Sequence, residues 1–163
     1  MIIAVVADTH GRTGQITERL RRLRPDHILF AGDFYKDGQS ISRCLNIPAD
    51  IVAGNCDLSH RSKMEAVVSL GEYKILLVHG HQYGVKKDLN RLYYRGRELE
   101  VDAIVFGHTH SPWCEQIGEM WLINPGSPVM PRSAGPGSFA IITIDAYGLQ
   151  ARIMSMAEPN PQI

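Results

Sequence analysis

Residues 2–10 read IIAVVADTH, an apolar run that ends in an aspartate and a histidine. A short apolar run beside a glycine-containing turn is typical of a buried strand. Four more apolar runs end the same way, with ligand-type residues at Gly32-Asp33, Gly54-Asn55-Cys56-Asp57, His79-Gly80-His81 and Gly107-His108-Thr109-His110. In open α/β sheets the ligand site lies beyond the carboxyl ends of the strands. The repeated pattern therefore predicts that all five clusters meet at one rim.

The donor atoms of these clusters restrict which ion they could hold. Carboxylate, amide and imidazole donors together suit Mn²⁺, Fe or Zn²⁺ better than Mg²⁺ or Ca²⁺, which prefer shells of oxygen. A single tetrahedral zinc would leave many of the donors unused. Two ions that share a bridging carboxylate would use them all, and such ion pairs are common in phosphoester hydrolysis. We expect two divalent transition-metal ions per chain, Mn²⁺ first, with Fe, Zn²⁺ and Ni²⁺ as alternatives.

The ordered series D-x-H, G-D, G-N-x-D, H-G-H and G-H-x-H resembles the calcineurin-like metallophosphoesterases. The small size and Asn124-Pro125-Gly126-Ser127 are similar to the compact phosphodiesterase subfamily, which also contains the non-catalytic retromer subunit Vps29. The resemblance extends from Met1 to about Ile144. It implies an α/β fold, a four-layer α/β/β/α sandwich of two packed sheets with flanking helices. Because nothing in the sequence suggests a nucleophilic side chain, we expect direct hydrolysis, in which a hydroxide that bridges two ions attacks phosphorus without a phosphoenzyme.

The resemblance assigns roles to the metal ligands. Asp33 would bridge the two ions, of which one would also be held by Asp8, His10 and His110, and the other by Asn55, His79 and His108. The residues alone leave a simpler interpretation open, because Asp8-Thr9-His10 could be an ordinary turn and Gly54-Asn55 a type I′ turn. On an extended segment, Asp8 and His10 would point the same way and could reach one ion.

Asn55, Cys56 and Asp57 form the expected catalytic group. Many phosphoesterases of this class have a histidine at the position of Cys56, where it faces the phosphate and can protonate the leaving group. A neutral thiol is a weaker donor without charge, so we expect a preference for diesters over monoester dianions. The alternative is a small buried cysteine with no role. Asp57 is expected to orient neighbouring groups, and His81 is left open as a metal ligand or a substrate contact.

Hydrophobic periodicity predicts the elements of one domain, residues 1–157, followed by a frayed tail at 158–163. Strands are expected at 2–7, 27–31, 51–53, 66–70, 73–78, 103–106, 121–123, 139–144 and 149–154. Helices are expected at 13–23, 39–45 and 85–99. The order is βαβα at the start and rich in strands at the end, which predicts two sheets packed face to face with helices outside.

Composition limits the partners and the compartment. Lys+Arg and Asp+Glu both number 17, so the chain has no global basic field for a membrane or polymeric nucleic acid. The three cysteines form no C-x-x-C pair, which favours reduced thiols and a cytoplasmic protein. We expect neither a signal peptide nor a membrane span, because the start lacks a basic region and no apolar run approaches about 18 residues. Five of the seven histidines fall in the rim clusters, and His27 and His60 do not.

Two functions follow from these patterns. The leading hypothesis is a metal-dependent phosphodiesterase that acts on a small phosphodiester. The alternative is a Vps29-like scaffold or interaction protein, without catalysis or weakly catalytic, that retains the metal site. A scaffold is free to lose ligands, and this chain keeps the whole set, so we favour the enzyme. The sequence leaves open the physiological substrate, the oligomeric state (a homo-oligomer included) and any substrate contact by arginines such as Arg12 and Arg132.

Overall fold

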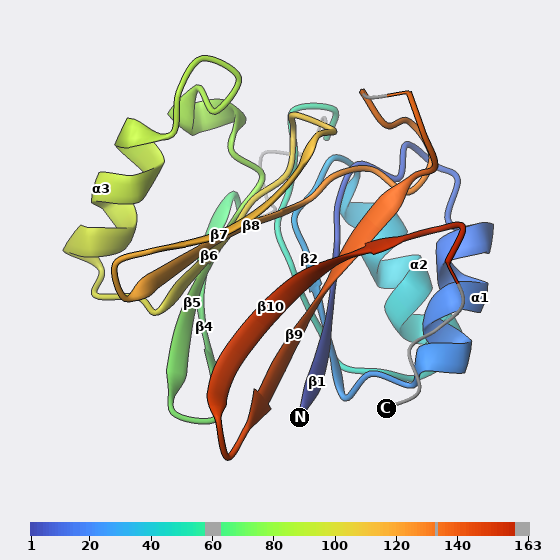
Figure 1. The fold of residues 1–163 in the computed structure, drawn as a ribbon. Coiled ribbons are helices and arrows are strands. Elements are labelled where there is room, and N and C mark those ends of the chain that lie inside the picture. The colour runs from blue at the N-terminus through green and yellow to red at the C-terminus, as the bar shows by residue number, and fades with distance from the viewer. Residues whose placement is uncertain (58–62, 133, 159–163) are drawn as a thin grey trace.

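The computed structural model describes residues 1–57, 63–132 and 134–158, and these form two packed sheets of five strands each (Figure 1). The strands are β1 (Ile2–Val6), β2 (His27–Phe30), β3 (Ala49–Ile51), β4 (Glu65–Leu70), β5 (Tyr73–Val78), β6 (Ala103–Val105), β7 (Pro112–Ile117), β8 (Met120–Pro125), β9 (Ser138–Asp145) and β10 (Gly148–Ser155). The helices are α1 (Gly14–Leu23), α2 (Tyr35–Leu45), α3 (Asn90–Glu98) and a short 3₁₀ turn, η1 (His81–Tyr83). His60 and residues 159–163 of the expected tail lie outside the described residues.

Each sheet has three neighbouring parallel strands. The first sheet has the order β10-β9-β1-β2-β3, in which β1, β2 and β3 are parallel. The second has the order β4-β5-β6-β8-β7, in which β5, β6 and β8 are parallel. Antiparallel strands flank the parallel ones in both sheets. The carboxyl ends of the parallel strands therefore carry the residues that follow each apolar run.

Alternating side chains explain the layers. In β1, Ile3 and Val5 face the second sheet, whereas Ala4 and Val6 pack with residues of α1 and α2. In β5, Ile75 and Leu77 join the core between the sheets, and Leu76 and Val78 pack on the side of α3. Helices thus cover the outer face of each sheet, as Figure 1 shows. The expected four-layer α/β/β/α sandwich is confirmed.

Several expected boundaries were wrong for local reasons. The helix expected at 85–99 begins only at Asn90, because Gly84 takes a left-handed φ of 68° and starts a separate turn. Helix α2 begins four residues earlier than expected, since the distant Asp57 carboxylate accepts the Tyr35 N–H at 3.0 and 2.9 Å. Strand β7 was missed because its side chains are mostly exposed and form no apolar run.

Two expectations from composition can also be compared with the fold. No helix in the described parts of the chain is both long and apolar enough to cross a membrane. The three cysteines, Cys44, Cys56 and Cys114, all carry free thiols. The structure therefore contains no disulfide among these positions, as the unpaired spacing predicted.

Candidate metal centre

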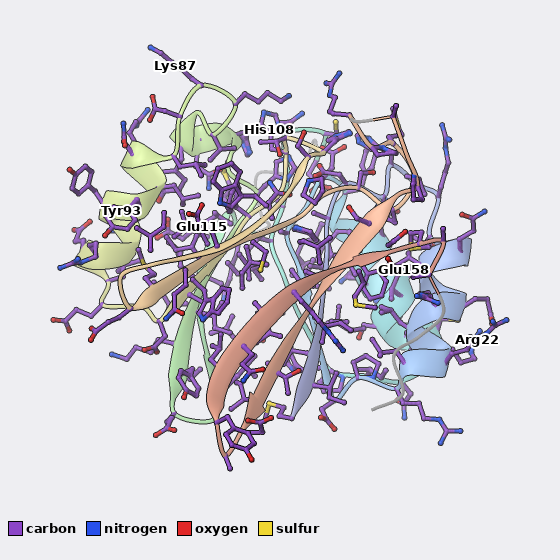
Figure 2. All side chains as sticks on the ribbon, viewed as in Figure 1. Arg22, Lys87, Tyr93, His108, Glu115 and Glu158 are labelled. Atoms are coloured by element: carbon purple, nitrogen blue, oxygen red, sulfur yellow. The ribbon has the colours of Figure 1, made fainter. Side chains whose placement is uncertain are left out.

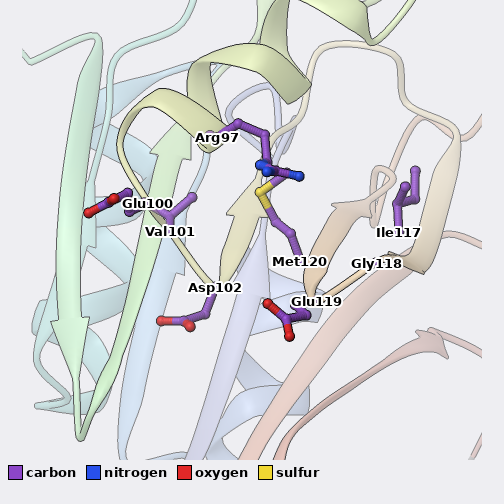
Figure 3. Close-up of a pocket in the computed structure, with 9 residues that line it drawn as sticks. Arg97, Glu100, Val101, Asp102, Ile117, Gly118, Glu119 and Met120 are labelled. Atoms are coloured by element: carbon purple, nitrogen blue, oxygen red, sulfur yellow. The ribbon is translucent and has the colours of Figure 1, made fainter.

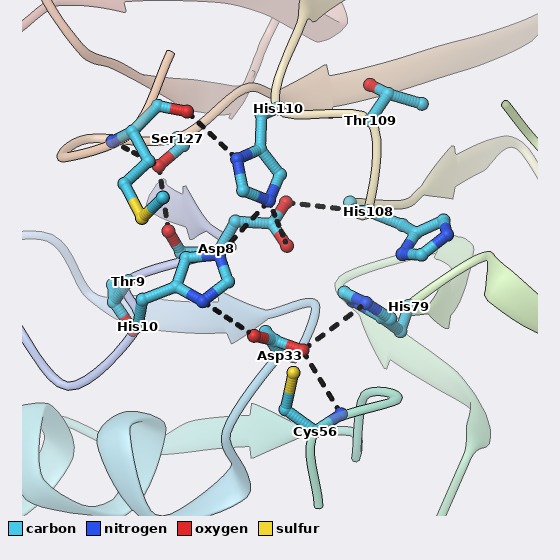
Figure 4. Close-up of polar contacts among 12 residues, drawn as sticks. Asp8, Thr9, His10, Asp33, Cys56, His79, His108, Thr109, His110 and Ser127 are labelled. Atoms are coloured by element: carbon cyan, nitrogen blue, oxygen red, sulfur yellow. Dashed lines mark hydrogen bonds and ion pairs between the residues drawn. The ribbon is translucent and has the colours of Figure 1, made fainter. Parts of the chain in front are cut away.

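The five sequence clusters meet where the parallel strands of the two sheets end (Figure 4). His10 Nδ1 lies 2.9 Å from Asp33 Oδ2, and His79 Nε2 lies 3.9 Å from Asp33 Oδ1. His110 Nε2 lies 3.6 Å from Asp8 Oδ1. These contacts join residues from both sheets, so the predicted rim is a real cluster of side chains.

The first group of donors consists of Asp8, His10 and His110, whose ligand atoms all lie within 4.8 Å of one another. The Nδ1–H of His110 donates to the Met130 carbonyl oxygen at 2.9 Å, which leaves a lone pair on Nε2. This Nε2 faces His10 Nε2 at 3.1 Å and Asp8 Oδ1 at 3.6 Å. Asp8 Oδ1 is buried and accepts no hydrogen bond. A buried carboxylate oxygen without a donor, facing imidazole lone pairs, is an arrangement that a cation would satisfy.

The second group lies around His79, which is fully buried. Its Nδ1–H donates to the Ala31 carbonyl oxygen at 2.7 Å, so Nε2 presents a lone pair to Asn55 Oδ1 at 3.0 Å. The ring of His108 stands edge-on to that of His79, with centroids 5.0 Å apart. Two ligands about 2.1 Å from a common ion and at right angles to each other would lie about 3 Å apart. The spacing of His79 and Asn55 therefore fits a shared ion.

Asp33 lies between the two groups. Its Oδ2 lies near His10 but accepts no aligned hydrogen bond, and its Oδ1 faces His79. Oδ1 also accepts the backbone N–H of Cys56 at 3.3 Å. The Asp33 side chain is almost fully buried. One carboxylate thus presents an oxygen to each group, which is the position that a bridging ligand needs.

The backbone of four rim residues is left-handed. Asp8, His10, His108 and His110 have φ values of 54°, 46°, 69° and 58°. The other described non-glycine residues with positive φ, Arg24, Asn46 and Glu100, lie at the C-terminal ends of helices. Asp8 and His10 do come together, but the expected extended backbone between them was wrong, because both residues are left-handed and the chain turns sharply. Such conformations cost on the order of 1–3 kcal/mol each and concentrate at functional sites.

Two glycines allow the strand ends to approach one another. Gly32 has φ 75°, and a Cβ there would lie 2.8 Å from Nδ1 of His79. A Cβ on Gly54 would lie 2.5 Å from the Cα of Asp33. Any larger residue would push Asp33 away from His79 and Asn55. The glycines in the G-D and G-N-x-D clusters are therefore needed for close packing.

Asp57 contacts the backbone and not the donor groups. Its carboxylate accepts N–H groups from Tyr35, at the start of α2, and from Gly54 at 3.0 Å. It therefore fixes the turn that carries Asn55 and Cys56. The Cys56 thiol lies 3.5 Å from Asn55 Nδ2. Burial and the nearby Asp33 carboxylate raise the pKa of the Cys56 thiol to about 11, so the thiol is neutral at pH 7.

His81 lies beside the second group without joining it through a hydrogen bond. Its ring centroid is 5.3 Å from that of His79 and 6.0 Å from that of His108. Nδ1 of His81 is buried and has no hydrogen-bond partner among the described residues. The position beside the rim agrees with either role that the sequence left open.

Burial controls the protonation of the donors. It raises the pKa of Asp8 to about 7, with a further contribution from the charge of Asp33. It lowers the pKa of His79 and His108 to about 4 each. Both imidazoles are therefore neutral at pH 7, which is the form that binds metal.

Metal-free Asp8→Asn protein is expected to lose part of the pH dependence of stability. Asp8 has a raised pKa, so its stabilising protonated form is lost as the pH rises through about 7. The lowered pKa values of His79 and His108 act oppositely: their contribution to stability grows as the pH rises from about 4 to about 6.5, and wild type and variant share it. In urea unfolding of chelated protein, the free energy of unfolding of wild type relative to Asp8→Asn should therefore fall as the pH rises from about 4 to about 7. A difference between the two proteins that stays constant over this range would contradict the assignment.

Sequence reasoning assigned no role to two residues that support the rim. Asn124 Nδ2 donates to the Gly107 carbonyl oxygen and to Thr109 Oγ1, both at 3.0 Å. Ser127 Oγ donates to the backbone oxygen of Asp8 at 2.7 Å. Asn124 and Ser127 entered the sequence argument only as part of a recognised motif.

A separate hollow of about 540 Å³ lies at the opposite end of the second sheet (Figure 3). Its lining includes Arg97, Glu100, Asp102 and Glu119, which lie near the start of β6 and β8. None of the imidazoles of the rim reaches it. The hollow therefore does not belong to the candidate metal centre.

The chain matches known proteins along most of its length. The model of the calcineurin-like phosphoesterase superfamily domain matches residues 1–147. The probable metallophosphoesterase YsnB of Bacillus subtilis is 33% identical over 159 residues, 96% of this chain and 92% of the relative. A solved structure from Streptococcus pneumoniae, described as a predicted phosphoesterase, has a TM-score of 0.83 at 25% identity, covering 99% of this chain and 94% of that chain. Zinc-bound Vps29 from Entamoeba histolytica has a TM-score of 0.76 at 24% identity, covering 96% and 99%.

Proposed function

Because this chain belongs to the calcineurin-like phosphoesterase superfamily, we propose that it is a two-metal phosphodiesterase acting on small phosphodiesters. The observation that carries the proposal is the pair of donor groups on either side of Asp33. Within each group the lone pairs face a single position that an ion could occupy. Asp8 Oδ1 and Asp33 Oδ2 are buried and accept no hydrogen bond. Carboxylate and imidazole donors in this number suit transition ions, with Mn²⁺ first.

The proposed ligand sets follow the two groups. Asp8, His10, Asp33 and His110 would hold one ion, and Asp33, Asn55, His79 and His108 would hold the other. When bound, such ions lower the pKa of water and neutralise charge on phosphoryl oxygens. The chain's own contribution is orientation. His79 and His110 are fixed by hydrogen bonds to backbone carbonyls, and Ser127 fixes the backbone of Asp8.

The neutral Cys56 thiol supports the preference for diesters. Its backbone N–H contacts Asp33, so the side chain borders the second donor group. A thiol there adds no positive charge beside a phosphate and is a weak donor to a leaving oxygen. A monoester dianion needs that charge more than a diester monoanion does. We therefore place small phosphodiesters with good leaving groups first among substrates.

A metal-supplemented screen tests the proposal directly. Protein purified without chelator would be assayed with Mn²⁺, Zn²⁺, Fe²⁺ and Ni²⁺ on matched aryl mono- and diesters. We expect hydrolysis of the diesters that chelator removes and metal restores. Absence of hydrolysis under every metal, in well-folded and metal-loaded protein, would contradict the proposal and favour the scaffold.

Cys56→His is expected to raise monoesterase activity relative to diesterase activity. An imidazole would restore both a proton donor and a positive charge beside the phosphate. The measurement is kcat/KM for a matched aryl monoester and diester, and we expect a shift of about 10-fold or more in their ratio. Cys56→Ser is the control, because it changes the thiol without adding charge. An unchanged or lower ratio in folded, metal-loaded Cys56→His protein would refute this explanation.

The scaffold alternative has less support. The likeness to Vps29, at 24% identity, concerns the fold alone. The left-handed backbone at Asp8, His10, His108 and His110 fits residues that hold ions, and a scaffold that retains the metal site would share it. The metal-supplemented screen therefore decides between the two functions.

A further inference from the structure

His10 lies in a tight turn between β1 and α1. The Arg12 N–H donates to the Thr9 carbonyl oxygen at 2.9 Å, which closes the turn around His10 and Gly11. Both central residues are left-handed, with φ values of 46° for His10 and 76° for Gly11. A left-handed residue other than glycine persists only where the surrounding structure holds it in place. The turn that carries this proposed ligand therefore needs support from another part of the chain.

Asp37, in the first turn of α2, supplies that support. Its Oδ2 accepts hydrogen bonds from the Thr9 hydroxyl at 2.6 Å and from the Gly11 N–H at 2.7 Å. These two donors belong to the residues on either side of His10. Short hydrogen bonds to a carboxylate are about twice as strong as those between neutral groups. Thr9 is fully buried, so water could not readily replace Asp37 as the partner of its hydroxyl.

Asp37 also ties this turn to the segment that carries Asp33. The Asp37 N–H donates to the carbonyl oxygen of Phe34, the residue after Asp33, at 3.1 Å. The ring of Phe34 in turn stands edge-on to that of His10, with centroids 6.2 Å apart. In this arrangement His10 Nδ1 lies 2.9 Å from Asp33 Oδ2, which is the spacing expected for two ligands of one ion.

We infer that Asp37 is a positioning residue that holds His10 at ligand distance from the bridging Asp33. The inference rests on the proposed function and adds a residue that acts through Thr9 and Gly11, without contact with the substrate. Asp57 supports the second donor group from the same helix, because it accepts the Tyr35 N–H at the start of α2. The first turn of α2 therefore supports ligands of both proposed ions.

Thr9→Val and Thr17→Val form a matched pair for the test. Each removes the hydroxyl of a buried threonine and leaves a side chain of nearly the same shape. The Thr17 hydroxyl donates to the Thr13 carbonyl oxygen, within the same helical segment, at 2.8 Å. Helix α1 leads away from the rim, since Arg22 in its last turn lies far from His108 in Figure 2. Only the first of the two variants therefore loosens the turn at the rim.

Calorimetric titration of metal-free protein with Mn²⁺ would give the Kd of each ion. We expect Thr9→Val to weaken the binding of one ion about 10-fold, as substitutions of residues that support metal ligands do. Thr17→Val should stay within about twofold of wild type, because distant sites act independently. The melting temperature of metal-free protein should fall by a similar amount in both variants, since each loses one buried hydrogen bond. Equal Mn²⁺ affinity in the two variants would overturn the inference.

Two variants of Asp37 separate its geometry from its charge. Asp37→Ala removes the acceptor and should weaken the binding of the same ion by about 10- to 100-fold. Asp37→Asn keeps an oxygen with two lone pairs, so it should retain most of the affinity. An equal loss in both variants would overturn the inference, because the charge alone would then explain it. Wild-type protein that binds no Mn²⁺ would overturn the proposed function as well, whereas an unchanged Kd in every variant would overturn this inference alone.

Discussion

Asp33→Asn is expected to remove both metal ions and to abolish turnover. The two oxygens of this buried carboxylate face different donor groups, Oδ2 toward His10 and Oδ1 toward His79. An amide at this position carries no negative charge and turns an NH₂ group toward one of the two groups. Both sites would therefore lose an essential ligand in a single substitution. We expect kcat/KM to fall by about 10³-fold or more. Substitutions of residues that merely support ligands already lower metal affinity or activity by about 10–100-fold, and Asp33 is a proposed direct ligand of both ions.

Elemental analysis of Mn²⁺-loaded, desalted protein measures the first part of this result. Wild type should hold two ions per chain, and Asp33→Asn should hold fewer than one. Asp50→Asn is the matched control, because Asp50 pairs with His27 at 2.9 Å, away from the rim, and should keep both ions. A reproducible wild-type value of one ion or fewer would refute the two-metal proposal.

The sequence was sufficient to predict which residues meet at the rim because the signal is local. Each ligand follows an apolar run, and the carboxyl ends of parallel strands meet at one edge of a sheet. Parallel β1, β2 and β3 and parallel β5, β6 and β8 supply that geometry. The pattern predicted both the strands and the meeting of their ends. The strand pairing follows from the same apolar alternation that forms the core between the sheets.

The parts that were not predictable depend on contacts between distant residues. Helix α2 starts where Asp57, 22 residues away, accepts the first N–H group of the helix. The left-handed backbone of Asp8 and His10 was also not predicted, because Asp and His adopt positive φ more often than most residues but still in a small minority of cases. Val85, in turn, packs on Gly80, which no local pattern in the sequence indicates. Periodicity describes one element at a time, so it carries no information about such contacts.

His108→Ala is expected to abolish turnover, whereas His27→Ala should leave it nearly unchanged. His108 lies on the rim, with its ring 5.0 Å from that of His79, and it is only half-buried, so its removal should not unfold the protein. His27 lies at the first residue of β2, at the other end of the strand from Asp33, where it pairs with Asp50. Loss of a direct ligand should lower kcat by at least about 10²-fold, because substitution of a residue that only supports a ligand already lowers activity by up to about that factor.

The comparison between the two histidines requires folded protein and known metal content. His79→Ala should also abolish turnover, but His79 is fully buried, so a cavity would lower stability at the same time. His108→Ala separates the two effects, because it should lose one ion per chain while keeping a melting temperature close to that of wild type. His27→Ala should keep both ions and lose at most the small stabilisation of a partly exposed ion pair. If His27→Ala reduced kcat as much as His108→Ala at equal metal content, the rim would not be the reaction site.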